Sequence, residues 1–242
     1  MESLELTDLV DLWVFLEATP LLWLTVTVVA YALADAISKR LNRNPLANPV
    51  LIAACLVVAV LVLSSTDYST YFSGAQFVHF LLGPATVSLA YPLVENWPAV
   101  KRAFPALLAS LVAGSVTAVV SVVALALAMG IEGAVLWSLV PKSVTTPIAM
   151  GISVEFGGIA SLTAVFVILT GILGAVLVTP IMNALKISDP AARGFAAGVA
   201  AHGIGTARAF QVNQVAGLFA GIAMALNGLL TALIVPIFAR LL

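Results

Sequence analysis

Three basic side chains lie in stretches that otherwise consist of small, apolar and hydroxyl-bearing residues. His202 and Arg208 belong to "HGIGTARA" (202–209), and Lys142 belongs to "VPKSVTTPIAM" (140–150). A buried cation is costly unless an anion or a dipole compensates its charge, so such residues are candidates for function. Histidine also exchanges protons near neutral pH. His202 therefore either carries a coupled proton or is a hydrogen-bonded structural residue, and we slightly favour the structural role.

The stretch around Lys142 combines a cation with hydroxyl groups at a helix-breaking proline. Lys142 either contacts a substrate anion or caps free backbone carbonyls, and we favour the anion because an ionisable residue at membrane depth is a functional hypothesis by default. Ser143, Thr145 and Thr146 either bind the same substrate or bond back to carbonyls of their own chain.

The second stretch offers backbone donors as well as a guanidinium. Gly203 and Gly205 allow the helix to open, and a half-helix beginning near Thr206 would direct its N–H groups into the gap. Arg208 either holds a carboxylate in a bidentate fork or binds a nearby carbonyl or an acid such as Glu155. Both stretches therefore suit a small anion with polar substituents.

The composition places these stretches in a membrane. Of 242 residues, 62% are hydrophobic and 9% are charged, whereas soluble proteins have about 25% charged residues. The net charge of −1 argues against nucleic acid, and one cysteine, Cys55, excludes a disulfide framework. The sequence has no metal-ligand cluster, paired carboxylates, nucleophile with a base, or phosphate loop. We therefore expect no enzyme activity, no cofactor and no metal.

Apolar runs of about 20 residues predict membrane-spanning helices. Five such runs are residues 21–37, 50–66, 103–129, 158–183 and 214–238. Three further apolar stretches are interrupted by Gly, Pro, Ser and Thr, namely 77–94, 134–152 and 190–212. Residues 1–20 are acidic and predict an amphipathic lead-in helix. The expected fold is an all-α polytopic membrane protein, with about five to seven transmembrane helices plus broken or re-entrant elements in one transport domain, 21–242.

The distribution of lysine and arginine predicts the orientation. The basic residues that flank the spans are Lys39, Arg40, Arg43, Lys101, Arg102, Lys186 and Arg193. By the positive-inside rule their loops face the cytoplasm, which leaves Glu132 and Glu155 outside. Residues 134–152 must then enter and leave on one side, as a re-entrant hairpin with its tip near Pro141. Residues 77–94 are expected to cross, and for 190–212 both crossing and re-entry remain open.

An internal repeat supports this organisation. A shift of 57 residues aligns "FVHFLLGPATVS" (77–88) with "AVLWSLVPKSVT" (134–145), and it brings Gly114, Gly171 and Gly228 into register. The repeat-like units are about 77–130, 134–185 and 190–242. Repeats that combine a span with a broken element are typical of secondary transporters, whose sites lie where the broken elements meet near the midplane.

Five motifs in one order give the sequence a family resemblance. They are "NPLANPVLI", "YFSGAQFVHFLLGPATVSLAYPL", "PKSVTTPIAM", "GGIASLTAVFVILTGILGA" and "ARGFAAGVAAHGIGTARAF". From about residue 45 to its end the chain resembles the LrgB/CidB family, described as holin/antiholin-like, paired with a small LrgA/CidA membrane protein and linked to murein hydrolase control. A related plastid protein exchanges glycolate and glycerate, and bacterial relatives are implicated in pyruvate uptake. The family motifs carry over to Lys142, Ser143, Thr145, Thr146, His202, Gly203, Gly205, Thr206 and Arg208.

Two classes of function follow. The first is a secondary carrier of two- or three-carbon carboxylates such as glycolate, glycerate, pyruvate or lactate, present as a homodimer in a bacterial cytoplasmic membrane. The alternative is a holin/antiholin-like regulator of murein hydrolase export and lysis. A holin assembles from simple helices. The repeats, broken elements and buried cations of this sequence therefore favour the carrier.

Overall fold

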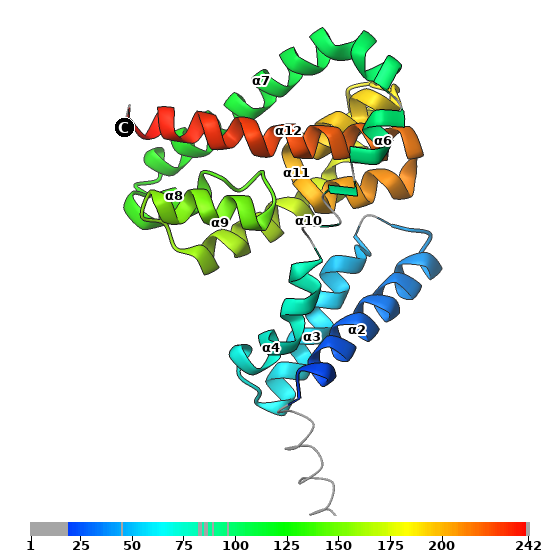
Figure 1. The fold of residues 1–242 in the computed structure, drawn as a ribbon, viewed down its shortest axis with the longest axis vertical. Coiled ribbons are helices and arrows are strands. Elements are labelled where there is room, and N and C mark those ends of the chain that lie inside the picture. Colours follow the sequence, from blue (N-terminus) through cyan, green and yellow to red (C-terminus); the bar gives the residue numbers. More distant parts are fainter. Residues whose placement is uncertain are drawn as a thin grey trace, which may run out of the picture. The chain divides into compact units, whose positions relative to one another are not determined.

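The computed structural model describes residues 19–44, 46–81, 84, 87–88, 90–95 and 97–240, and every regular element within these ranges is a helix (Figure 1). The chain divides into two compact units, Met1–Val87 and Ser88–Leu242. The lead-in helix expected for residues 1–20 lies, apart from its last two residues, outside the described part of the chain. Residues 77–94 are described only in part, so their expected crossing stays a prediction.

The first unit contains α2 (Pro20–Arg40), α3 (Pro49–Ser64) and α4 (Tyr68–Phe80), with α2 packed against both of the others. The Trp23 ring is fully buried and meets the edge of Tyr71, with ring centroids 6.1 Å apart. The side chain of Asn48 caps the start of α3. Helices α2 and α3 fall where the first two spans are predicted.

The second unit contains seven described helices. They are α6 (Ala90–Glu95), α7 (Trp97–Ala128), α8 (Gly133–Leu139), α9 (Thr146–Glu155), α10 (Ala160–Ala184), α11 (Pro190–Val212) and α12 (Gln214–Ala239). In the described part of the whole chain, four helices are long and apolar enough to cross a membrane, namely α2, Val100–Ala128 of α7, α10 and α12. These lengths confirm the expected all-α polytopic class.

Helices α8 and α9 form the predicted hairpin. The helix ends before Pro141, whose ring disfavours continuation, and the next helix starts with a proline at its second position. Hydroxyl groups fasten the hairpin to α10. Ser138 Oγ accepts a 2.8 Å hydrogen bond from the Ile159 N–H, and Ser153 Oγ lies 2.7 Å from Thr163 Oγ1.

Helix α11 is a second hairpin, broken at Ala201 (φ −128°, ψ 18°) and His202 (φ 41°, ψ −133°). A Cβ atom at Gly205 would lie 2.6 Å from the Ala197 carbonyl oxygen, so the residues after the break pack against those before it. Both arms also reach the same part of α12, because Gly194 and Ala209 each approach Ala216. The chain therefore reverses at His202 and returns to the end at which it entered.

The reversal at His202 determines the path of residues 190–212. The stretch 190–212 folds back on itself, which is the path expected of a re-entrant element. Its second arm begins at Gly203, whereas the sequence indicated a half-helix beginning near Thr206. The reason is that Gly205 is needed inside the arm, where it lets the two arms approach closely, and His202 itself adopts the conformation that reverses the chain.

The two hairpins are related by the predicted 57-residue shift. Adding 57 to the bounds of the first hairpin, Gly133 and Glu155, gives Pro190 and Val212, the bounds of the second. The glycines in register behave alike, since a Cβ at Gly114, Gly171 or Gly228 would press on a side chain of a hairpin, namely Val199, His202 or Ile148. Because the first hairpin ends where α10 begins and the second begins where α10 ends, the two hairpins lie at opposite ends of α10.

Helix α12 runs past both hairpins and joins their cores. Its first half packs with Phe195 and Val199 of α11, and its second half packs with Leu136 and Val140 near the first hairpin. Helix α7 contributes to both clusters. The tips of the hairpins therefore lie beside the middle of α12.

Candidate functional site

The two hairpin tips meet at Asn227, near the middle of α12. Its amide Nδ2 donates to the carbonyl oxygens of Ser143 in the first tip and Val199 in the second, both at 3.1 Å. Its Oδ1 accepts a hydrogen bond from Ser115 Oγ of α7. The Asn227 side chain is 1% exposed, so each of these bonds forms away from solvent. A buried amide whose partners come from three elements fixes their relative position.

His202 closes the second tip. Its Nε2 lies 2.8 Å from the Val167 carbonyl oxygen of α10, and its own carbonyl accepts a 2.8 Å bond from Thr206 Oγ1. A carbonyl only accepts, so Nε2 carries a proton and Nδ1 is the nitrogen that can take up another. Gly171 makes the space for the ring, because a Cβ there would lie 2.7 Å from His202 Cε1.

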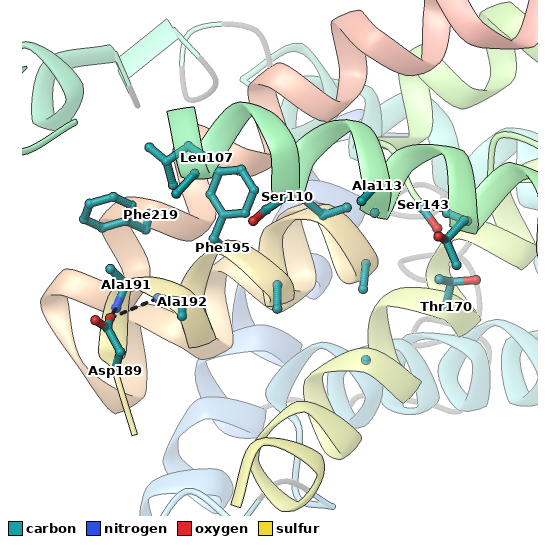
Figure 2. A pocket seen from close by; sticks show the side chains of 18 of the residues that line it. Leu107, Ser110, Ala113, Ser143, Thr170, Asp189, Ala191, Ala192, Phe195 and Phe219 are labelled. Carbon is teal, nitrogen blue, oxygen red and sulfur yellow. Dashed lines mark hydrogen bonds between the residues drawn. The ribbon is translucent and has the colours of Figure 1, made fainter. Parts of the chain in front are cut away.

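A cavity of about 960 Å³ extends to the first tip between α7, α10 and the first arm of α11. Figure 2 shows its extent: Asp189 and Ala191 lie at one end, Ser110 and Ala113 lie along the wall, and Ser143 and Thr170 lie at the other end. Most of the lining is apolar. We call this space the tip cavity.

Lys142 gives the tip cavity its positive charge. Its Nζ donates to Ser143 Oγ at 3.2 Å and lies within electrostatic range of the His202 ring. Among the described residues that line the cavity, the one other charged residue is Asp189 at the opposite end, which accepts from the Ala191 and Ala192 N–H groups and so caps α11. An anion in this cavity would meet mostly apolar walls and one ammonium, and opposite charges attract more strongly beside apolar walls than in bulk water.

The candidate residues from the sequence fall into groups. Lys142 and Ser143 line the tip cavity, and His202 lies at the neighbouring tip. Thr145 is the residue before α9, where its side chain makes no capping bond, and Thr146 begins that helix. Lys142 and Ser143 therefore belong to the described cavity lining, and the two threonines do not.

The remaining second-hairpin candidates have other surroundings. Gly203 starts the second arm, Gly205 lies between the arms, and the Thr206 hydroxyl is engaged with the His202 carbonyl. Arg208 lines a different cavity near the ends of the arms, and its Nη1 donates to Gln211 Oε1 at 3.5 Å. Lys142 and Arg208 therefore do not line the same cavity.

Sequence reasoning missed Asn227, Ser115 and Thr170. Thr170 lines the tip cavity, and the 57-residue shift places it in register with Asn227. A signal was present, since an amide in the middle of the apolar stretch "AMALNGLLTALIV" is expensive in a membrane unless it has partners. A search for polar residues inside the clear spans would have found it.

Comparisons with known proteins agree with the motifs. A model described as the LrgB-like family matches residues 27–241. The Bacillus subtilis "Uncharacterized protein YwbG" is 35% identical over 213 residues, which cover 88% of this chain and 94% of the relative. The "Antiholin-like protein LrgB" of Bacillus subtilis is 30% identical over 223 residues, covering 92% and 96%. The "Holin-like protein CidB" of Staphylococcus epidermidis is 30% identical over 220 residues, covering 91% and 96%. No solved structure matches this chain significantly.

Proposed function

The chain belongs to the LrgB-like family, and from that premise and the geometry of the tips we propose that it is a secondary carrier of small carboxylates in a bacterial cytoplasmic membrane. The observation that carries the proposal is the Lys142 ammonium beside the Ser143 hydroxyl, in a mostly apolar cavity that ends where two hairpins from opposite ends of α10 meet. Inverted repeats with broken helices that meet at mid-depth are the usual build of such carriers.

The substrate class follows from the groups at the deep end of the tip cavity. An ammonium compensates one carboxylate, and the hydroxyls of Ser143 and Thr170 can bond the neighbouring hydroxyl or keto oxygen of a two- or three-carbon acid. Glycolate, glycerate, pyruvate and lactate all have this pattern. By the positive-inside rule the Asp189 end of the cavity faces the cytoplasm. Alternating access would then require one hairpin to move against the other.

The test is uptake of radiolabelled glycolate, glycerate and pyruvate by the purified protein in liposomes. We expect saturable uptake, lost in Lys142→Gln and also in Lys142→Arg, because a planar guanidinium does not replace a compact ammonium. Lys101→Gln, which removes an exposed lysine outside the cavity lining, is the matched control and should transport normally. Folding of each variant is checked by its thermal unfolding. Unchanged uptake by folded Lys142→Gln would refute the proposed site.

His202 is the proposed proton carrier, because Nδ1 is available for a proton beside the bound anion. If this is correct, His202→Gln abolishes uptake driven by a pH gradient but leaves substrate exchange at equal pH intact, since exchange moves no net proton. Loss of both activities together would assign His202 a structural role.

A holin- or antiholin-like function is the second candidate, and the printed names of two relatives favour it. The two functions differ in what they let through. A carrier takes up a labelled acid without releasing calcein from the same vesicles, whereas a holin-like assembly releases calcein without saturation by any acid. Repeating both measurements with a co-expressed small membrane protein of the LrgA/CidA kind tests whether a partner is required. Light scattering of the purified protein tests the expected homodimer.

A further inference from the structure

The tip cavity is much larger than a two- or three-carbon acid. Its volume is about 960 Å³. A water molecule occupies about 30 Å³ in the liquid, and at that size for each non-hydrogen atom pyruvate needs about 200 Å³. The lining also follows α7 from Ala103 to Ala118, which is about 20 Å at the rise of an α-helix. A short acid beside Lys142 therefore leaves most of the cavity to be filled by something else.

The polar groups of the cavity are concentrated at its deep end. Ser143 and Thr170 lie there in Figure 2, and Lys142 Nζ donates to the Ser143 hydroxyl. Toward the other end, Ser110 contributes a hydroxyl, and the rest of the described wall comes from alanines and from Leu107, Val199, Phe195 and Phe219. Apolar walls of this kind are stabilised when ligand carbon atoms, instead of water, cover them.

The hydrogen bonds of Asn227 show where the apolar wall begins. Ser115 of α7 and Ser143 of the first tip both bond to Asn227, so the deep end of the cavity is level with Ser115. Ala113 lines the cavity two positions earlier on α7, and Ser110 lies about 7 Å from that level along the helix axis. A carbon chain that starts from a carboxylate at Lys142 therefore passes Ala113 within its first few methylenes.

The charges at the two ends favour a ligand with one carboxylate. Lys142 is the one cation in the described lining, and Asp189 lies at the opposite end. A second carboxylate at the far end of a ligand would be held among apolar walls without a compensating cation, and it would approach the Asp189 carboxylate. Dicarboxylates are therefore disfavoured.

We infer that the tip cavity selects monocarboxylates with an apolar tail and binds 2-oxo acids of about five or six carbons more tightly than pyruvate. The carboxylate pairs with Lys142, and the hydroxyls of Ser143 and Thr170 bond the 2-oxo oxygen. The tail covers the wall beyond Ala113. The inference rests on the proposed function for the position of the carboxylate, and it adds a second part to the substrate.

The test is isothermal titration calorimetry of the purified full-length protein in phosphatidylcholine nanodiscs. The ligands are pyruvate, 2-oxobutyrate, 2-oxopentanoate and 2-oxohexanoate, which share one polar end and differ by one methylene at each step. Each methylene that leaves water for the apolar wall should tighten binding about fourfold, so 2-oxohexanoate should bind about 50-fold more tightly than pyruvate. 2-Oxoglutarate has the length of 2-oxopentanoate but a second carboxylate, and it should bind more weakly than 2-oxopentanoate.

Variants of the wall separate binding in the cavity from partitioning of the longer acids into lipid. Ala113→Leu fills the space for the tail and should reduce the ratio of the pyruvate and 2-oxohexanoate dissociation constants to less than about fivefold. Ala196→Leu fills the same space from α11 and decides the matter if Ala113→Leu does not fold. Ala124→Leu changes an exposed alanine of α7 outside the described lining, and this matched control should keep the wild-type ratio.

The outcomes distinguish this inference from the carrier function. Equal binding of pyruvate and 2-oxohexanoate by the wild type, or a wild-type ratio in both Ala113→Leu and Ala196→Leu, would overturn the inference and leave a carrier of short acids standing. A tail preference that persists in Lys142→Gln would place the acids elsewhere and overturn it as well. Tail-dependent binding without uptake of any of these acids into liposomes would support the inference but refute the carrier function. Absence of binding by every acid would overturn both.

Discussion

His202 adopts a backbone conformation that glycine tolerates and that costs other residues about 1–3 kcal/mol. The bond from its ring to the Val167 carbonyl and the bond from Thr206 to its own carbonyl hold this conformation in place. A strained residue that persists at a chain reversal is often tied to function. Here it places an imidazole at the second tip, where a glycine would have made the turn without strain but would have contributed no side chain.

The strain at His202 predicts that a glycine variant is more stable than an alanine variant, the reverse of the usual order. His202→Ala and His202→Gly both lose the bond to Val167, but glycine also relieves the strain at φ 41°. We expect His202→Gly to be more stable than His202→Ala by about 1 kcal/mol, although glycine normally destabilises through unfolded-state entropy. Thermal unfolding of the two variants measures the difference. An alanine variant as stable as the glycine variant would contradict the argument.

The contact between α10 and the second hairpin depends on Gly171. Alanine there would place its Cβ 2.7 Å from His202 Cε1 and 2.8 Å from Ile204 Cδ1, so the ring must leave its bond with Val167. We expect Gly171→Ala to lower the free energy of unfolding by about 1–3 kcal/mol. Gly151→Ala on α9 is the control, since a Cβ there meets nothing within 4 Å, and it should raise stability by about 0.5–1 kcal/mol.

The link between the hairpins depends on Asn227. Asn227→Ala removes the donor shared by the Ser143 and Val199 carbonyls and the acceptor for Ser115, which should cost about 3 kcal/mol. Ser121→Ala, on the exposed face of α7, should change stability by less than about 0.5 kcal/mol. Denaturant unfolding in detergent compares the two. Equal effects would mean that the tips are held together by other contacts.

The sequence predicted one hairpin better than the other for a physical reason. Pro141 interrupts the first hairpin through its own ring, so the break is a local property of the sequence. The second break falls at His202. The sequence indicated instead that the helix opens at the neighbouring Gly203 and Gly205, because glycine permits unusual backbone conformations. The position of the break depends on contacts with α10 and on packing between the arms, neither of which is visible in local sequence.

For the whole molecule, the arrangement of hairpins predicts a labelling pattern. In a Cys55→Ala background, Glu132→Cys and Glu155→Cys should react with an impermeant maleimide on intact cells. Ala184→Cys, at the end of α10, and Val212→Cys, at the end of α11, should react only after the cells are permeabilised, because the positive-inside rule predicts that both positions face the cytoplasm. Labelling of Ala184→Cys and Val212→Cys from opposite sides would mean that α11 crosses the membrane.

The two cations that the sequence singled out, Lys142 and Arg208, line different cavities in the structure. The sequence analysis assigned Lys142 and Arg208 to one substrate site because both interrupt apolar stretches. The structure places one beside the tips and the other near the ends of the arms, because α11 reverses before Arg208. The sequence shows that each charge lies in an apolar stretch and is costly to bury. The position of each charge along the hairpins can be known only from the path of the folded chain.

The 57-residue register also shows where the two hairpins differ in sequence. Lys142 and Ser143 of the first copy correspond to Val199 and Ala200 of the second, and all four line the tip cavity. Two lysines at these positions would have placed like charges across one apolar space. The first hairpin thus contributes an ammonium and a hydroxyl to the cavity lining, whereas the second contributes apolar wall at the same positions. Substitutions at 199 and 200 are then limited by volume, whereas those at 142 and 143 are limited by charge and hydrogen bonding.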